Sequence, residues 1–278
     1  MKGLSLLFIV LFVYLFFILV RTVSTSTIFN NSAHVNVVFY GKDTYFYSLS
    51  KKNSTNYYMY LWPDIELTVP GGFGKYRLGA LGKLVELDKN KDLYRKSFSN
   101  LTGTFIDFYI YPSGDSIFYG KSEKDGLNSV SVFEILLRKS NMNILERAYV
   151  SYLFLRKPPS SFKILHFNND VKKTYQGYFY NESYRNEKLN VQILYTKSYS
   201  TSVAIGQIIE GEGIRIVDVS NDPEKSTGCR IVNGTEGQSL TVKALSRFFN
   251  CPVTKGKTGG YDILFKLGDL EKKWLMED

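Results

Sequence analysis

The stretch EKLNVQILYTKSYSTSVAIGQIIEGEGIRIVDVSN, residues 187–221, decides the fold of the C-terminal part of the chain. Apolar and β-branched residues fill 189–195 and 214–219, which predicts two strands. The run 200–210 between them predicts a helix, which ends at the glycines that follow it. A strand, a helix and a second strand joined by short turns are typical of an α/β layer.

The rest of the C-terminal part continues this alternation. We expect strands over 229–232 and 261–267, with a helix over 241–249 between them. The whole of 187–278 is therefore predicted to form a small α/β domain.

The two cysteines of the chain, Cys229 and Cys251, flank the helix predicted over 241–249. In an oxidising compartment, a disulfide that closes about 22 residues contributes about 3 kcal/mol to stability. Two small buried thiols are the alternative. We expect the disulfide, with a structural and not a catalytic role.

The longer stretch before this domain, 35–167, predicts an α+β unit. Strands are expected over 36–40, 45–48, 57–62, 65–69, 105–111 and 162–167, and helices over 76–87, 93–100, 131–139 and 143–157.

Local signals set several boundaries in this unit. The strand over 65–69 is expected to extend the sheet, and the strand over 162–167 to be buried. Asp92 is placed to cap the helix that follows it, and Asn143 with Glu146 resembles a capping box. Two consecutive prolines stop that second helix. The polar residues 168–186 predict a connection between two units.

The N-terminus carries the run GLSLLFIVLFVYLFFILV, residues 3–20, which contains no charged residue. Such a run in a helix spans about 27 Å, close to the thickness of the hydrocarbon core of a bilayer. We expect a transmembrane anchor over 1–21 and a stalk over 22–34. Lys2 favours a cytoplasmic N-terminus, so the bulk of the chain is expected outside the cytoplasm, at the cell membrane. A cleaved signal peptide and a buried core helix are the alternatives.

Composition narrows the classes of function. The 278 residues carry a net charge of +9, which favours polyanionic partners. The expected placement outside the cytoplasm and the scatter of the basic residues argue against nucleic acid. An anionic membrane face or a phosphate-bearing envelope polymer fits this charge better. With two histidines and two cysteines, we expect no transition-metal site, His-based triad or redox dithiol motif.

Two stretches of the N-terminal unit resemble the bacterial LytR-CpsA-Psr family of envelope proteins. The first is VNVVFYGKDTYFYSLSKK (35–52) with LWPDIELTVPGGFGKYRLGALGKL (61–84), and the second is SNMNILERAYVSYLFLRKPPSSFKILHF (140–167). Members of the family are single-pass proteins that face outward. The resemblance implies a fold in which catalytic members use magnesium and arginines to transfer glycopolymers from a polyprenyl-pyrophosphate carrier to peptidoglycan.

The chain departs from the family where the family holds pyrophosphate. The Arg-Ser-Asp element after "G-x-D" is absent, and the arginine of "P-R-D" falls at Pro63. Arginine matches pyrophosphate through its forked donors, and proline cannot replace it. The residues that remain from the family's site are Asp43, Asp64, Lys75 and Arg77. The alternative for these residues is that the two aspartates cap turns and the two basic residues lie on the surface.

Residues 187–275 resemble the accessory C-terminal domain of the same family, often called LytR-C. The match covers its order of strand, helix, "G-x-x-V-x-x-V" strand, second helix and "D-I-x-x-x-L-G". The small-residue turn of that pattern reads Tyr-Thr-Lys-Ser here, over 195–198. The resemblance carries no assigned chemistry to single residues of this domain.

These observations lead to one expected function and one main alternative. We expect a non-catalytic, membrane-anchored envelope protein that uses no cofactor and binds an anionic cell-wall polymer, a polyprenyl-phosphate lipid or a protein partner. The alternative is an active magnesium-dependent glycopolymer transferase, which requires Asp43, Asp64, Lys75 and Arg77 to converge on one pocket. A surface protein unrelated to this family is the third possibility.

Overall fold

The computed structural model describes residues 13–14, 16–17, 20, 33–51, 55–114, 116–121, 126–168, 170–237 and 239–277. The predicted anchor (1–21) and stalk (22–34) therefore lie almost wholly outside the described residues. Within the described residues, no helix has the length and apolar character needed to cross a membrane. The described chain is a mixed α/β structure.

The N-terminal unit is built on a mixed six-stranded sheet in the order β7-β6-β1-β2-β3-β8. Its strands are β1 (His34–Phe39), β2 (Thr44–Ser50), β3 (Asn56–Leu61), β6 (Phe108–Tyr111), β7 (Lys139–Ser140) and β8 (Phe162–Leu165). The central strand β1 pairs antiparallel with β2 and parallel with β6. Neighbouring side chains of β1 point to opposite faces, so each face of the sheet has its own core.

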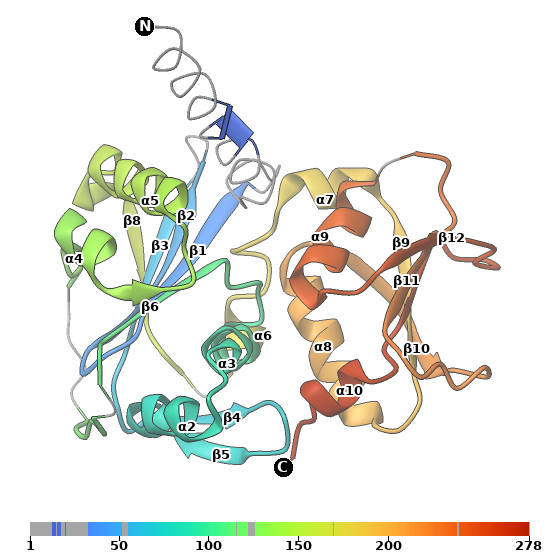
Figure 1. The fold of residues 1–278 in the computed structure, drawn as a ribbon, viewed down its shortest axis with the longest axis horizontal. Coiled ribbons are helices and arrows are strands. Elements are labelled where there is room, and N and C mark those ends of the chain that lie inside the picture. The colour runs from blue at the N-terminus through green and yellow to red at the C-terminus, as the bar shows by residue number, and fades with distance from the viewer. Residues whose placement is uncertain are drawn as a thin grey trace, which may run out of the picture.

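Helices cover both faces of this sheet (Figure 1). Val37 and Phe39 pack with α4 (Val132–Leu137) and α5 (Ile144–Arg156). Val38 points to the other face, which is covered by α2 (Leu81–Asp88) and α3 (Asp92–Thr102). The tyrosines and phenylalanines that are so numerous in the sequence fill much of both cores.

Two predictions in this unit were wrong because a tight turn reverses the chain. The segment predicted to extend the sheet is β4 (Glu66–Val69), which pairs instead with β5 (Gly74–Arg77) as a separate hairpin. Gly71 and Gly72 lie at positive φ in the turn between them, a conformation that glycine adopts without strain. The helix predicted from residue 76 therefore begins only at Leu81, after a short 3₁₀ turn.

Three further boundaries differ from the predictions. Asp92 lies inside the first turn of α3 and pairs with Arg95 at 2.8 Å, so it does not cap the helix. β6 begins at Phe108 and not at 105, because Phe105 packs into the other unit. β8 is an edge strand whose middle residues are exposed, so it is not the buried strand that was expected. The capping box at Asn143 is confirmed.

The C-terminal unit holds a five-stranded mixed sheet in the order β10-β9-β13-β11-β12. Its elements are β9 (Asn190–Tyr195), α8 (Tyr199–Gly211), β10 (Arg215–Asn221), β11 (Arg230–Asn233), α9 (Leu240–Phe249), β12 (Val253–Lys255), β13 (Ile263–Lys266) and α10 (Leu270–Lys273). The predicted alternation of strands and helices is confirmed. The short elements β12 and α10 were not predicted.

The predicted disulfide between Cys229 and Cys251 is present, with the two Cα atoms 5.5 Å apart. It joins the residue before β11 to the segment that links α9 to β12. Because β11 and β12 are parallel neighbours, the bridge closes the end of the sheet where both begin.

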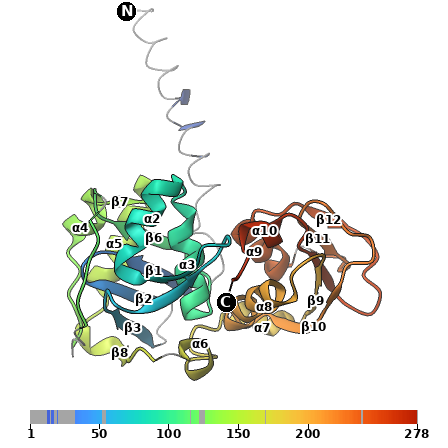
Figure 2. The ribbon, with the colours of Figure 1, turned by 90° about the horizontal axis from the view of Figure 1, so that it is seen from below.

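The two units lie side by side in both views of the ribbon (Figures 1 and 2). The connecting segment is not a simple loop, since it contains α6 (Val171–Thr174) and α7 (Glu182–Glu187). At the junction, the ring of Phe105 stacks on that of Phe248 with centroids 4.0 Å apart. The C-terminal end of the chain returns to the N-terminal unit, where Leu275 O accepts the N–H groups of Gly71 and Gly72.

Candidate functional site

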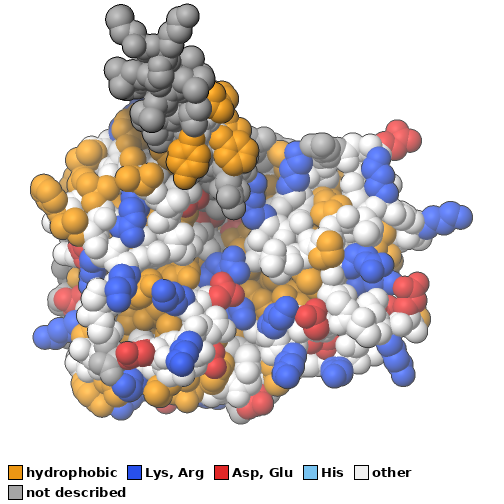
Figure 3. Space-filling view, in the orientation of Figure 1, with side chains coloured by type: hydrophobic (Ala, Val, Ile, Leu, Met, Phe, Trp, Pro, Cys, Tyr) orange, Lys and Arg blue, Asp and Glu red, His pale blue; other side chains and the backbone are white. Residues whose placement is uncertain are grey.

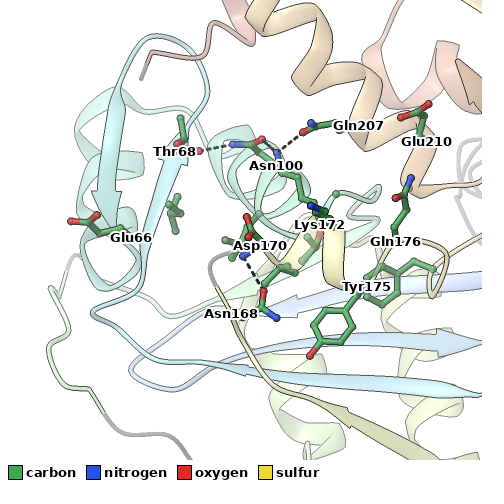
Figure 4. Close-up of a pocket in the computed structure, with 18 residues that line it drawn as sticks. Glu66, Thr68, Asn100, Asn168, Asp170, Lys172, Tyr175, Gln176, Gln207 and Glu210 are labelled. Carbon is green, nitrogen blue, oxygen red and sulfur yellow. Dashed lines mark hydrogen bonds between the residues drawn. The ribbon is translucent and has the colours of Figure 1, made fainter. Parts of the chain in front are cut away.

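A cavity of about 630 Å³ lies where α3, α6 and α8 meet at the junction of the two units. We call it the junction pocket. Figure 4 shows its side chains, which come from both units and from the connecting segment. The polar side chains of its wall are Glu66, Thr68, Asn100, Thr102, Asn168, Asp170, Lys172, Lys173, Tyr175, Gln176, Gln207 and Glu210.

Lys172 brings a cation into the wall of this pocket. Its ammonium group donates to Asn100 Oδ1 at 2.7 Å and to Gln207 Oε1 at 3.4 Å. Among the described residues, no carboxylate lies within ion-pair distance of it, and burial lowers the pKa of Lys172 to about 8. Its stem packs on Gly103, where an added Cβ would lie 3.1 Å from Lys172 Cγ.

The amide side chains of the pocket are held in place by the backbone and by one another. Asn100 donates through Nδ2 to Thr68 O at 3.1 Å, which turns its carbonyl oxygen toward Lys172. Asn168 bonds to the hydroxyl of Thr174 at the pocket edge. Amides offer donors and acceptors together, and carboxylates offer acceptors, so this wall can bind groups that both donate and accept, such as hydroxyls.

A second cavity of about 310 Å³ adjoins the junction pocket, and the two share Gln176 and Glu210 in their walls. We call it the basic pocket, because Arg185, Lys188 and Arg215 line it. The guanidinium of Arg185 lies 5.0 Å from the ring centre of Tyr180, which fixes its direction. The planar, forked donors of arginine match two oxygens of a phosphate or carboxylate.

No protein-family model, curated protein or solved structure matches this chain. The resemblance to the LytR-CpsA-Psr family therefore stays a prediction that depends on the quoted segments.

The structure brings together only two of the four side chains named from that resemblance. Asp64 and Arg77 form an ion pair at 3.9 Å, and Arg77 also lies over the ring of Tyr119. Asp43 follows β1 and accepts a hydrogen bond from Tyr60 at 3.0 Å. Lys75 is exposed on β5. None of the four lines the junction pocket.

Sequence reasoning missed the residues that do line the two pockets. Lys172, Arg185 and Lys188 belong to the segment predicted as a polar connection, and Asn100 to the end of a predicted helix. Only the cluster of cations in 172–188 could have indicated the site.

Within the described residues, no group of three or more His, Cys, Asp or Glu side chains is placed to hold a metal ion.

Proposed function

We propose that this chain is a membrane-anchored, non-catalytic envelope protein that binds an anionic, hydroxyl-rich polymer in the junction and basic pockets. The observation that carries the proposal is that the two cavities adjoin and share Gln176 and Glu210 in their walls. A chain of sugar or polyol units joined by phosphate presents alternating hydroxyl and anionic groups. The walls of the two adjoining pockets present amides that can bind hydroxyls and cations that can bind phosphate.

The charges of the pocket walls support an anionic ligand. The walls contain five basic residues, Lys172, Lys173, Arg185, Lys188 and Arg215, and three acidic ones, Glu66, Asp170 and Glu210. Lys172 has amide partners in place of carboxylates, so an incoming phosphate gains a cation without first breaking an ion pair. The net charge of +9 favours the approach of a polyanion.

The placement outside the cytoplasm is part of the proposal and depends on the sequence. Residues 3–20 have the length and composition of a membrane anchor, and Lys2 favours a cytoplasmic N-terminus. The dispersal of Asp43, Asp64, Lys75 and Arg77 supports binding over transfer chemistry, because the transferase alternative needs these groups in one pocket. The ion pair of Asp64 and Arg77 alone supplies no such pocket.

Calorimetric titration of the full chain in detergent micelles tests the proposal. The probe is a poly(glycerol phosphate) decamer, with a neutral maltooligosaccharide of similar length as the comparison. Lys172→Met keeps the stem that packs on Gly103 and removes the charge, so we expect the Kd for the decamer to rise by about tenfold. Lys243→Met removes an equal charge from the exposed face of α9 and serves as the matched control.

The pH dependence of binding gives a second measurement. Because the pKa of Lys172 is lowered to about 8, the free site loses this charge as the pH rises through 8. Affinity for the decamer should therefore fall between pH 7 and pH 9, and the fall should be absent in Lys172→Met. Equal losses in Lys172→Met and Lys243→Met, or equal affinity for the neutral oligosaccharide, would contradict the proposal.

A further inference from the structure

The helices α4 and α5 expose apolar side chains in place of the polar ones that a surface helix normally presents. On α5, Ile144 and Leu155 are 76% and 75% exposed, and on α4, Phe133 and Leu137 are 72% and 80% exposed. Figure 3 shows hydrophobic side chains gathered over this part of the molecule. The opposite side of both helices is also apolar and packs on the sheet. A helix that is apolar on both sides is expected to be covered on both sides.

This apolar face is held rigidly. The guanidinium of Arg147 on α5 donates through Nη1 to the carbonyl oxygens of Ile135, Leu136 and Arg138 at 2.7–2.8 Å, which binds the last turn of α4 to α5. The capping box at Asn143 fixes the start of α5. The exposed side chains therefore share one preformed surface, which we call the α4–α5 face.

The surroundings of the α4–α5 face are basic. Residues 131–157, which contain α4 and α5, include five basic and two acidic residues. Both acidic residues already have partners in the fold, since Glu134 pairs with Arg138 and Glu146 completes the capping box. Arg156 is exposed on α5, where its guanidinium lies over the ring of Tyr152, and Lys157 follows it. Apolar side chains flanked by cations are typical of surfaces that lie on anionic bilayers.

The chain enters the N-terminal unit beside this face. His34 is the first residue of β1, and Lys157, at the C-terminal end of α5, lies close enough to contribute to lowering the pKa of His34. Residues 21–33, which separate β1 from the apolar run 3–20, span at most about 45 Å when fully extended. An anchor in the bilayer would therefore keep the α4–α5 face near the membrane.

We propose that the α4–α5 face docks on an anionic lipid bilayer, with Phe133, Leu137, Ile144 and Leu155 entering the headgroup region and the flanking cations binding lipid phosphates. The inference rests on the membrane placement proposed above and adds the surface that makes the contact. The helices α3 and α6, which line the junction pocket, lie on the opposite face of the sheet. Docking through α4 and α5 would direct that pocket away from the bilayer, toward the envelope polymers.

The test uses tryptophan quenching in the full chain, reconstituted in vesicles of equal parts phosphatidylglycerol and phosphatidylcholine with brominated acyl chains. Leu137→Trp and Ile144→Trp place the reporter on exposed positions of the α4–α5 face. Val253→Trp places it on an exposed position of the C-terminal unit and is the matched control. We expect the emission added by Leu137→Trp and Ile144→Trp to fall at least about twofold, and that of Val253→Trp to stay unchanged. Vesicles of phosphatidylcholine alone should quench less.

Flotation of the same samples separates the two proposals. Protein that floats with the vesicles but shows equal quenching at residues 137, 144 and 253 would overturn the docking face and leave the membrane anchor in place. Protein that does not float would overturn both. Shielding of Leu137→Trp from aqueous acrylamide without lipid quenching, together with cross-linked dimers, would assign the face to a second copy of the chain and also overturn the proposal.

Discussion

The hydroxyl of Thr104 donates a hydrogen bond to the carboxyl of Glu212 at 2.5 Å, across the junction of the two units. The same carboxyl oxygen accepts the N–H of Phe105 at 2.6 Å. Glu212 is buried, and burial raises its pKa to about 8 against the opposing effect of these hydrogen bonds. The junction thus holds a carboxyl group that stays largely protonated at neutral pH.

We predict that the stability of the chain falls as the pH rises toward 8. The folded chain holds a proton on Glu212 that the unfolded chain, with a pKa of 4.5, releases, so the free energy of unfolding decreases between pH 4.5 and pH 8. The slope from this single group reaches about 1.4 kcal/mol per pH unit. Asp107, whose pKa burial raises to about 6, adds to the slope below pH 6.

Glu212→Gln keeps an acceptor for Thr104 and Phe105 but cannot ionise. Thermal unfolding of this variant should therefore depend less on pH between 6 and 8 than that of the original chain. Glu236→Gln, at an exposed turn, is the control and should leave the slope unchanged. An unaltered slope in Glu212→Gln would show that this carboxyl does not ionise on unfolding in that range.

Close backbone contact at the junction makes Gly211 intolerant of a side chain. A Cβ at Gly211 would lie 1.6 Å from the carbonyl oxygen of Gly103, so α8 and α3 would have to move apart. We expect Gly211→Ala to lower the free energy of unfolding by about 2–3 kcal/mol and to increase cleavage between the units in limited proteolysis. The control is Gly206→Ala in the same helix, where a Cβ meets only Ile193 Cδ1 at 3.5 Å.

Gly206→Ala should be neutral or stabilising by up to about 1 kcal/mol, because alanine favours helix more than glycine does. Equal losses in the two variants would mean that the cost comes from α8 itself and not from its contact with Gly103.

Local signals in the sequence were enough to predict the features that depend on residues close together in the chain. The capping box of Asn143 and Glu146 and the position of the disulfide depend on residues near in sequence or on the ends of one helix. The predicted alternation of strands and helices over 187–267 is confirmed, because the hydrophobic residues of each long element have a clear period. The strand β4 was predicted, but its pairing with β5 was missed, because β5 has only four residues, too few for an alternation to be distinguished from the start of a helix.

The pockets could not be predicted because their walls come from distant parts of the chain. Asn100, Lys172 and Gln207 meet only once the two units are packed together. Phe105 shows the same limit, since it lies beside a strand of one unit and yet packs on Phe248 of the other. At the residues that line the junction pocket, the packing of one unit on the other decides the position of the side chain, and local sequence patterns do not.

The buried carboxylate of Glu271 holds the turn before α8, so we expect its substitution to lower the free energy of unfolding. Its carboxylate accepts the N–H and hydroxyl of Thr196 and the N–H groups of Lys197 and Ser198, at 2.5–2.8 Å. Glu271→Gln replaces one acceptor oxygen with a donor, which leaves part-buried N–H groups of the turn without partners. We expect denaturant unfolding to show a loss of about 2–3 kcal/mol.

The exposed Glu236→Gln again serves as the control and should change stability by less than about 0.5 kcal/mol. If Glu271→Gln were as stable as the control, the N–H groups of the turn would have to be satisfied by other acceptors, and the prediction would be wrong.

The contribution of the disulfide to stability can come from restricting the unfolded chain or from packing in the folded one, and two measurements distinguish these causes. Cys251 is buried beside Phe249 and Phe265, whereas Cys229 is half-buried at the start of β11. The bridge spans 22 residues, and a loop of this length contributes about 3 kcal/mol by restricting the unfolded chain. We expect Cys229→Ser to lower the free energy of unfolding by about that amount, and reduction of the original chain to lower it similarly. Cys229→Ser should not respond to reductant. A loss on reduction well below that in Cys229→Ser would locate the effect in packing around the serine and not in the closed loop.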